Sequence, residues 1–427
     1  MSTYKINFQM QDKYNFVLSL FICAIIPSLV VGAAVMEFFI FLSCILFFFL
    51  NFKKIGLNYY KKIFFIIFSL FCFFLILSSL LSDNLLNSLR NTIFYFRFGI
   101  LALIICYLLD NYKKFKLLFF NSIFITLIAV IVYSFIQIFF LKNYVSDNRI
   151  SGLFGDELVQ GSFLLRITPI FFIFFLYNKA IFHNKYFIFI FYLLLSSSLL
   201  LIIFSGERSA IFLSGICIFL SFLFFKLNFI KIFLSSLLIL IISVSAFYIY
   251  PKSKERVIDK TIGQLFYVQD GLGKNIKKNI NFFSEGHQDH MEAAIMIFKK
   301  NYILGIGVRN FRIECKNDEY KIVGRYHCST HPHNTYIQLL AETGLIGFSF
   351  IMLFLSFVFK EIYIFFKNNT NQKKKLNITL ASCFVIILIN LFPFVPTGSF
   401  FNNWLSTLYF IPVGLLLHEI DHDMKAE

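Results

Sequence analysis

The sequence predicts an all-α polytopic membrane protein with about 12 transmembrane helices and one large loop between the ninth and tenth helices. The chain has 427 residues, of which 58% are hydrophobic and 15% charged, and its mean hydropathy is +0.76. Soluble domains carry roughly 25% charged residues. Apolar runs of about 18 or more residues recur along the chain, which is the length that crosses a bilayer core of roughly 30 Å. These observations exclude an ordinary soluble domain.

The predicted spans are apolar stretches separated mostly by short polar turns. They cover residues 16–33, 35–51, 63–81, 91–109, 117–138, 160–178, 187–204, 209–225, 232–250, 334–359, 377–395 and 404–418. We expect the first span to stay uncleaved, because it lacks a small-residue cleavage site and another apolar run follows at once. The chain then divides into nine helices in residues 1–250, a large loop with short helices in residues 251–333, and three helices with the C-terminus in residues 334–427.

Lysines near the ends of the spans predict the orientation, because cytoplasmic loops carry an excess of Lys and Arg. They all fall on one side if both termini are cytoplasmic, and the large loop then lies outside the cytoplasm. These lysines are Lys53, Lys54, Lys61, Lys62, Lys113, Lys114, Lys116, Lys179, Lys185, Lys226, Lys231, Lys373, Lys374 and Lys375. Much of the formal net charge of +16 is this topology signal, so no nucleic-acid partner is expected.

Two of the eight cysteines, Cys315 and Cys328, lie in the large loop. The other six fall inside predicted spans, where a small apolar side chain serves packing. In an oxidising compartment the loop pair is expected to form a disulfide. Such a bridge would close a loop of about a dozen residues and stabilise the fold by roughly 3 kcal/mol. The alternative is two free thiols in the same loop.

Five of the eight histidines also lie in the large loop: His287, His290, His327, His331 and His333. One interpretation is a metal site, built from the HxxH and HxH pairs. The spacings differ from those of common zinc sites and no HExxH occurs, so we expect neither a metal nor another cofactor. The favoured interpretation is one catalytic imidazole, because the unperturbed pKa of roughly 6.5 suits a general base. His290 and His327 are better explained as solvated surface residues.

Three arginines lie in or beside predicted spans: Arg97, Arg166 and Arg208. Charges there are costly and usually face a cavity or a partner. A guanidinium suits a phosphate, because it offers two parallel donors and stays charged. We therefore treat all three as candidate ligands of an anionic substrate. Arg97 and Arg166 could equally belong to interhelical ion pairs, and Glu207 could pair with Arg208.

The stretch from His333 reads His-Asn, nine residues, Gly344, two residues and Gly347. It resembles the histidine motif of the bacterial O-antigen ligase and O-antigen polymerase superfamily. SGERSA around Arg208 resembles that superfamily's turn with a functional arginine, and NRISGLFGDELVQGSFL resembles an earlier periplasmic segment. Twelve helices, cytoplasmic termini and a large loop after the ninth helix also agree with it.

The resemblance implies an enzyme of the bacterial inner membrane with its active site facing the periplasm. Members move a glycan from undecaprenyl diphosphate to an acceptor hydroxyl, by metal-independent transfer with inversion. Ligases use lipid A-core as acceptor, polymerases use another lipid-linked chain, and some relatives glycosylate proteins. The His-Asn motif favours the ligase. Carried over, His333 is the catalytic base, and Arg208 holds the diphosphate and stabilises it as leaving group.

One feature departs from the superfamily's pattern. Many relatives have an arginine early in the large loop, whereas this chain has His287 in EGHQDHMEAA at the matching position. Either His287 binds the substrate there, or Arg309 or Arg312 supplies the missing charge. Asn334, next to the base, could orient His333 or cap the helix that follows.

A function from a different class, a polysaccharide flippase embedded among membrane lipids, also fits a chain with many helices and intramembrane arginines. Transporter folds usually show repeated halves with broken helices, and no internal repeat is visible here. A purely structural scaffold would leave the polar groups without a purpose. The enzyme hypothesis requires that Arg208 and His333 meet in one cavity.

Overall fold

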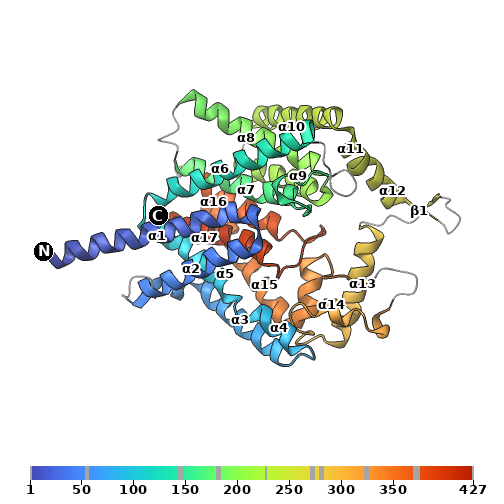
Figure 1. The fold of residues 1–427 in the computed structure, drawn as a ribbon, viewed down its shortest axis with the longest axis horizontal. Coiled ribbons are helices and arrows are strands. Elements are labelled where there is room, and N and C mark those ends of the chain that lie inside the picture. Colours follow the sequence, from blue (N-terminus) through green and yellow to red (C-terminus); the bar gives the residue numbers. More distant parts are fainter. Residues whose placement is uncertain are drawn as a thin grey trace.

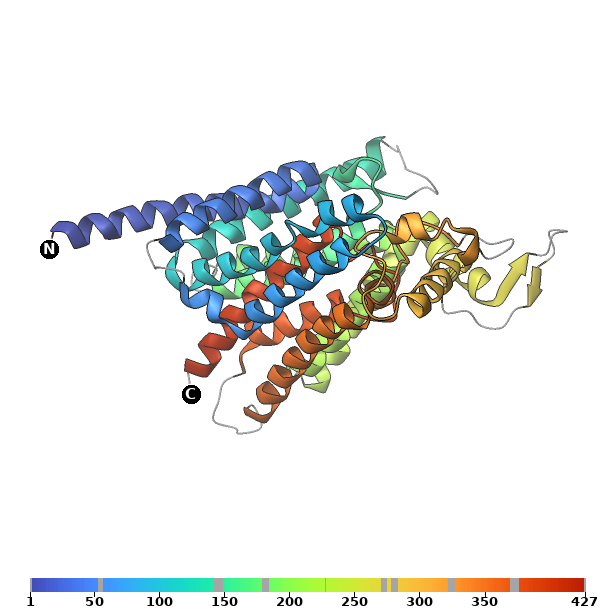
Figure 2. The same cartoon turned by 90° about the horizontal axis from the view of Figure 1, so that it is seen from below.

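Long helices run side by side through most of the computed structural model, and the polar connection between residues 251 and 333 gathers at one end of them (Figure 2). The structure describes residues 2–52, 57–141, 149–178, 184–226, 228–269, 275–277, 283–321, 327–368 and 376–425. Some lysines of the predicted cytoplasmic side lie outside these ranges: Lys53, Lys54, Lys179, Lys373, Lys374 and Lys375. Asn148, at the start of the quoted NRIS segment, lies outside them as well.

The first part of the chain supplies ten helices among the described residues (Figure 1). They are α1 (Ser2–Val31), α2 (Ala33–Phe52), α3 (Ile63–Leu80), α4 (Leu85–Thr92), α5 (Phe96–Asn111), α6 (Phe115–Ile136), α7 (Gln160–Tyr177), α8 (Lys185–Phe204), α9 (Arg208–Phe224) and α10 (Phe229–Ile249). Short 3-10 and π turns join some of them, at Leu57–Lys61, Gln137–Leu141 and Gly152–Phe154.

The polar connection holds short elements, and the last part of the chain returns to long helices. The short elements are α11 (Pro251–Lys254), a π turn (Glu255–Asp259), α12 (Lys260–Phe266), β1 (Tyr267–Gln269), β2 (Asn275–Lys277), α13 (Glu285–Lys300), α14 (Phe311–Glu314) and a 3-10 turn (Asp318–Tyr320). The strands β1 and β2 pair antiparallel, with Val268 opposite Ile276. The final helices are α15 (Thr335–Asn368), α16 (Ile378–Asn390) and α17 (Asn403–Lys425).

Each predicted span falls on a helix, but not every helix is long and apolar enough to cross a membrane. Seven qualify by length and composition within the described residues, or eight if the pair Leu237–Ile249 and Pro251–Gly263, bent by 110°, is one span. Three further apolar helices are shorter, namely Ala33–Phe49, Arg208–Phe224 and Ile378–Asn390. A fold of helices with several apolar helices of membrane-spanning length is therefore confirmed, apart from the short strand pair β1–β2 in the polar connection. The count of twelve spans and the side of the membrane on which the polar connection lies stay predictions.

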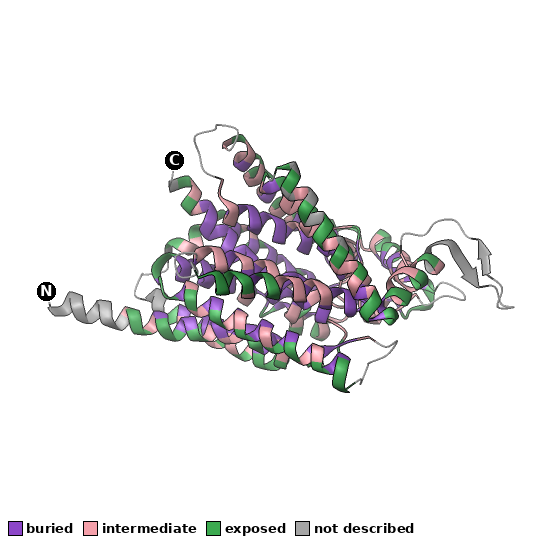
Figure 3. Ribbon diagram, turned by 90° about the horizontal axis from the view of Figure 1, so that it is seen from above, coloured by how far each residue is buried: buried purple, intermediate pink, exposed green. Residues whose placement is uncertain are grey.

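Helix α5 lies at the centre of the bundle. Every residue from Phe98 to Leu109 is buried, and Figure 3 shows that exposed positions lie mainly on the outer faces of the helices. Its closest neighbour is α17. A Cβ atom on Gly414 would lie 2.6 Å from the carbonyl oxygen of Ala102, so glycine is needed where these two helices touch.

A polar clamp ties the helix ends together at the end of the bundle that holds both chain termini (Figure 2). A hydrogen bond joins Nδ1 of His418 to the carboxylate of Asp110 between α17 and α5, and Lys62 forms an ion pair with Asp421. Tyr177 donates a hydrogen bond to Glu419 at 2.6 Å. The polar connection lies at the opposite end. Both termini therefore share one side, as the lysine pattern predicts.

Helix α15 is broken at Gly344, which adopts φ 62° and ψ −167°. The turn after α13 enters this break, and the amide of Leu345 donates to the carbonyl of Tyr302 at 2.8 Å. A Cβ atom at position 344 would lie 2.2 Å from the carbonyl oxygen of Ile303. Gly344 therefore serves close packing between α15 and the polar connection.

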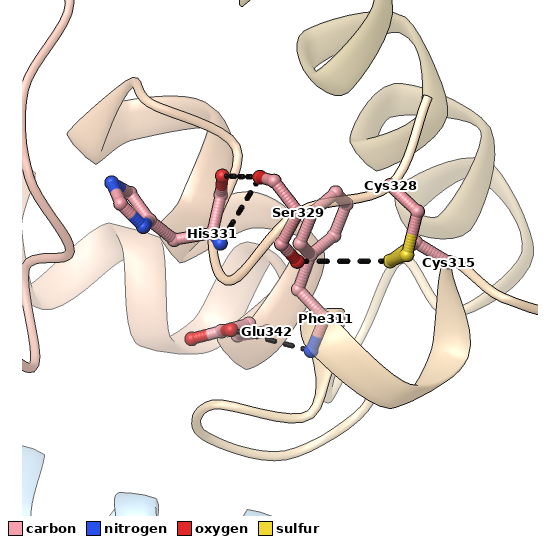
Figure 4. The surroundings of a disulfide bond; sticks show 6 residues. All are labelled: Phe311, Cys315, Cys328, Ser329, His331 and Glu342. Carbon is pink, nitrogen blue, oxygen red and sulfur yellow. Dashed lines mark hydrogen bonds between the residues drawn. A yellow bond between two sulfur atoms is a disulfide. The ribbon is translucent and has the colours of Figure 1, made fainter. Parts of the chain in front are cut away.

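The polar connection has a small apolar core of its own, which includes Ile297, Phe311 and Cys315. Cys315 and Cys328 form a disulfide with a Cα–Cα distance of 5.2 Å (Figure 4). Ser329 follows the bridge directly, and its hydroxyl donates to the carbonyl of His331 at 2.6 Å. The disulfide thus fixes the chain a few residues before the histidine motif.

Replacing both Cys315 and Cys328 by serine is expected to destabilise the polar connection by roughly 3 kcal/mol, because the bridge closes a short loop. The residues are 13 positions apart. Limited proteolysis of the detergent-solubilised protein should show faster cleavage within the connection, while the membrane helices stay protected. The Cys217→Ser variant, which changes a free cysteine of α9, is the control. Equal cleavage of all three proteins would contradict the expectation.

Candidate functional site

A cavity of about 1680 Å³ opens at the end of the bundle, where the polar connection meets the helices. Its wall comes from the α1–α2 turn, the start of α7, the α8–α9 turn, the polar connection and the segment between α16 and α17. Six arginines line it: Arg149, Arg166, Arg208, Arg256, Arg309 and Arg312. Glu157 and Glu207 are the lining carboxylates among the described residues. The excess of positive charge suits an anionic ligand.

His333 lies at the centre of a group of imidazoles in this cavity. Its ring centroid is 4.1 Å from that of His331, 4.6 Å from that of His287 and 5.3 Å from that of His290. His333 and Arg208 both line the same cavity. The structure therefore brings together the two residues that sequence reasoning assigned to catalysis.

The backbone at His333 is strained. Its φ is 60°, a left-handed conformation that is uncommon for residues other than glycine and often found at functional sites. The segment between α16 and α17 holds it there: the amide of Thr397 donates to the carbonyl of His333 at 2.8 Å. The carbonyl of Thr397 lies 3.2 Å from Nε2 of His331. His333 lies just before α15 and lines the cavity.

Asn334 caps α15. Its Oδ1 accepts hydrogen bonds from the amides of Tyr336 at 3.0 Å and Ile337 at 3.1 Å, which is the usual role of asparagine before a helix. Its Nδ2 donates to the carbonyl of Pro393 at 2.8 Å. Of the two expected roles, the cap is the one present in the structure.

The imidazoles of His333 and His331 favour the neutral form. Burial lowers the pKa of His333 to about 3, and the positive charges of His331, His287 and His290 act in the same direction. Burial also lowers the pKa of His331 to about 4, although its hydrogen bond to Thr397 opposes this. At neutral pH the His333 ring is therefore unprotonated and able to accept a proton.

Stability should fall when the protein is acidified, because the two imidazoles titrate differently in the unfolded chain. There, histidine has a pKa near 6.5. Between that value and the folded pKa of about 3 for His333, the unfolded state binds more protons, so stability decreases as the pH decreases. The thermal midpoint should be lower at about pH 5 than at about pH 7. Replacing both His331 and His333 by asparagine should weaken the pH dependence of the thermal midpoint. The expectation is wrong if the variant shows the same pH dependence as wild type.

Arg208 is the first residue of α9 and follows a tight turn in which Gly206 has φ 64°. One of its guanidinium nitrogens donates to the hydroxyl of Thr261 at 3.3 Å. The carboxylate of Glu207 accepts hydrogen bonds from the amides of Gly161 at 2.7 Å and Ser162 at 3.1 Å. Glu207 therefore caps the start of α7 and anchors the turn that carries Arg208.

Arg166 and Arg97, the two arginines inside predicted spans, differ in their surroundings. Arg166 is only 4% exposed, lines the cavity and donates to the carbonyl of Ser162 at 3.0 Å. Its Nε has no hydrogen-bond partner among the described residues. Arg97 instead pairs with Glu37 of α2, with 2.7 Å between Nε and Oε2, and it is not one of the cavity-lining residues. Arg97 thus takes the interhelical role that was its alternative.

The other expected substrate ligands all line the cavity: His287, Arg309 and Arg312. His287 lines this cavity together with Arg208 of the α8–α9 turn. Burial is the main cause that lowers the pKa of His287, and the neighbouring charges of His290 and Arg208 lower it further. A cationic imidazole at this position would therefore need a bound anion to raise its pKa.

Sequence reasoning missed two lining arginines, Arg149 and Arg256. Arg149 donates from Nε to the carbonyl of Ser205 at 3.2 Å, and Arg256 donates from Nε to the carbonyl of Gly206 at 3.2 Å. Both side chains therefore reach the α8–α9 turn from distant parts of the sequence. Arg149 stands inside the NRIS segment that resembles the superfamily, which was the available signal; Arg256 lies among other charges in KSKERV.

Two groups of side chains among the described residues have donor atoms close enough together to hold a metal ion, and both lie at the other end of the bundle. They are Asp110 with His418 and His422, and Cys106 with Asp110 and Asp421. That the cavity works without a metal stays a prediction.

A comparison with known families matches residues 190–352 to the O-antigen ligase family. No curated protein matches the chain. The matched segment begins in α8, contains Arg208 and the polar connection, and ends in α15 beyond His333 and Gly344. Members of this family are glycan-transferring enzymes of membranes. The match covers the histidine motif and supports the resemblance to the O-antigen ligase superfamily that this motif carries.

Proposed function

We propose that the protein transfers a glycan from undecaprenyl diphosphate to an acceptor hydroxyl, as an O-antigen ligase with lipid A-core as acceptor. The observation that carries this proposal is the meeting of His333 and Arg208 in one cationic cavity. A diphosphate leaving group needs preorganised positive charge, and the acceptor hydroxyl needs a base. The cavity lies at the end of apolar helices, where a lipid-linked donor can keep its tail in the membrane.

His333 acts as general base in this mechanism. Its neutral imidazole takes the proton of the acceptor hydroxyl as the oxygen attacks the anomeric carbon of the donor sugar. The bond from that carbon to the diphosphate oxygen breaks, and the configuration inverts. Burial lowers the pKa of His333. A diphosphate anion beside the imidazole raises this pKa, because negative charge favours the protonated ring.

Arg208 stabilises the departing diphosphate. Negative charge grows on the bridging oxygen as the glycosidic bond breaks, and a fixed guanidinium offers two parallel donors to it. Glu207 and Gly206 hold the turn that carries Arg208. Arg166, buried in the same wall with an unpartnered Nε, adds positive charge to the donor side.

The proposed location is the bacterial inner membrane with twelve spans and the cavity open to the periplasm. Three features support it: lysines gather on the side of the termini, the polar connection lies at the opposite end, and this connection holds a disulfide. Disulfides persist in the periplasm and are rare in the cytoplasm.

Reconstitution in liposomes tests the proposal. The purified protein would receive a lipid-linked glycan together with lipid A-core, a second lipid-linked chain or an unglycosylated acceptor protein. We expect the glycan to appear on lipid A-core, without added metal. Elongated lipid-linked chains would instead identify a polymerase, and glycosylated protein a protein glycosyltransferase. Movement of an intact donor across the bilayer without any product would overturn the enzyme assignment in favour of a flippase.

A further inference from the structure

Two of the three lining arginines of the polar connection form a pair of their own. Arg309 lies in the turn before α14, and Arg312 lies within α14, three residues later. Arg208 and Arg256 form a second pair at the α8–α9 turn, where Arg256 contacts the carbonyl of Gly206. The cavity thus holds two groups of paired guanidinium ions on different structural elements.

The imidazole cluster shares the cavity with both arginine pairs, since His287, His331 and His333 are also lining residues. The His333 ring stands 4.6 Å from the ring of His287 and 4.1 Å from the ring of His331. The candidate base and two cationic groups therefore face one cavity.

The arginine pair of the connection is held in place. Arg309 has a left-handed backbone with φ 59°, and its guanidinium donates to Oδ1 of Asn91 at 2.8 Å. The turn that carries it is fixed to α15, because the amide of Gly307 donates to the carbonyl of Glu342 at 2.9 Å. A non-glycine residue in this conformation costs free energy that the surrounding structure must offset.

Hydrogen-bonding capacity on this pair is unused. The Nε atoms of Arg309 and Arg312 are buried and have no hydrogen-bond partner among the described residues. Buried donors normally have a hydrogen-bond partner, and a buried donor without a partner costs free energy. Glu342 attracts Arg309, which leaves one of two positive charges without a matching carboxylate in the described part of the site. A phosphate group would supply both acceptors and charge.

We infer that Arg309 and Arg312 form a second anion subsite that binds a phosphate group of the acceptor. This inference rests on the proposed function, in which the donor diphosphate occupies the Arg208 side. His333 lines the same cavity as both subsites, where it can take the proton of an acceptor hydroxyl that attacks the anomeric carbon of the donor. The acceptor is accordingly a phosphorylated glycolipid. Its phosphate is either an ester on a sugar, as in lipid A-core, or the diphosphate of a second lipid-linked chain.

Acceptor kinetics of the full-length protein in liposomes test the inference. The Arg312→Gln variant should show a KM for phosphorylated acceptor about 10- to 100-fold above wild type, because a charge-assisted pair is lost. Its KM for the donor should not change. Wild type should lose the same factor when the acceptor is enzymatically dephosphorylated, and the variant should no longer distinguish the two acceptors. Comparing lipid A-core with a second lipid-linked chain identifies the source of the phosphate.

The matched control is Arg90→Gln, which changes an exposed arginine of α4 that does not line the cavity. The inference fails if Arg312→Gln raises the donor KM instead, or if wild type uses dephosphorylated acceptor equally well. If no transfer occurs, the subsite can still be tested by measuring how tightly phosphorylated and dephosphorylated acceptor bind to wild type and to the variant without donor. Absence of transfer with selective binding refutes the proposed function alone; unselective binding refutes the subsite.

Discussion

Alanine in place of His333 is expected to lower glycan transfer by about 10²- to 10⁴-fold, the range that a general base contributes. The protein should remain in the membrane with its disulfide formed, since the His333 side chain does not belong to the apolar cores. Transfer from lipid-linked donor to lipid A-core in liposomes measures the effect. Cells that carry the variant should lack the glycan on their surface lipid.

Backbone strain provides the control for this experiment. Position 333 has φ 60°, which alanine tolerates poorly and glycine accepts readily. The His333→Gly variant should therefore fold at least as well as His333→Ala, yet transfer as little. If the glycine variant regains transfer, the loss in the alanine variant came from misfolding, and His333 is not the base.

Arg208→Gln is expected to reduce transfer by about 10²- to 10³-fold, as removal of one preorganised donor to a developing anion does. Arg208→Lys should also lose at least about 10-fold, because the charge survives while the planar fork is lost. The loss should lie in kcat more than in the KM of the acceptor. Rates with saturating donor and acceptor separate these terms.

The exposed arginine of α4 again supplies a control, as Arg90→Lys. A second check uses the leaving group. If Arg208 stabilises the departing diphosphate, a donor with a better leaving group should suffer less from Arg208→Gln than the natural donor. Equal losses for both donors would show that Arg208 only positions the turn.

The sequence predicted the helical membrane fold because apolar length and lysine placement are local signals. The shared cavity of His333 and Arg208 was expected for another reason, because each residue sits in a short motif whose residues are contiguous; their catalytic roles stay a proposal. What remained invisible was three-dimensional pairing. Arg149 and Arg256 reach the α8–α9 turn from distant segments. The periodicity of a sequence does not predict such long-range contacts.

The predicted helix 377–395 ends earlier in the structure than its apolar pattern does. Helix α16 ends at Asn390, just before Pro393, which cannot continue a helix. The residues that follow hold His333 through Thr397. Gly344 interrupts α15 in a similar way, because glycine accepts the left-handed backbone at which the turn after α13 packs. Helix propensity and the contacts of the site therefore act together at both breaks.

The disulfide between Cys315 and Cys328 has a consequence for membrane insertion. Its formation requires an oxidising compartment, and Ser329 links it to the backbone of His331. A molecule inserted in the opposite orientation would expose both thiols to the reducing cytoplasm. The segment before His333 would then lack its disulfide cross-link. Under the proposed function and topology, the covalent bond therefore couples assembly of the site to the orientation of the protein in the membrane.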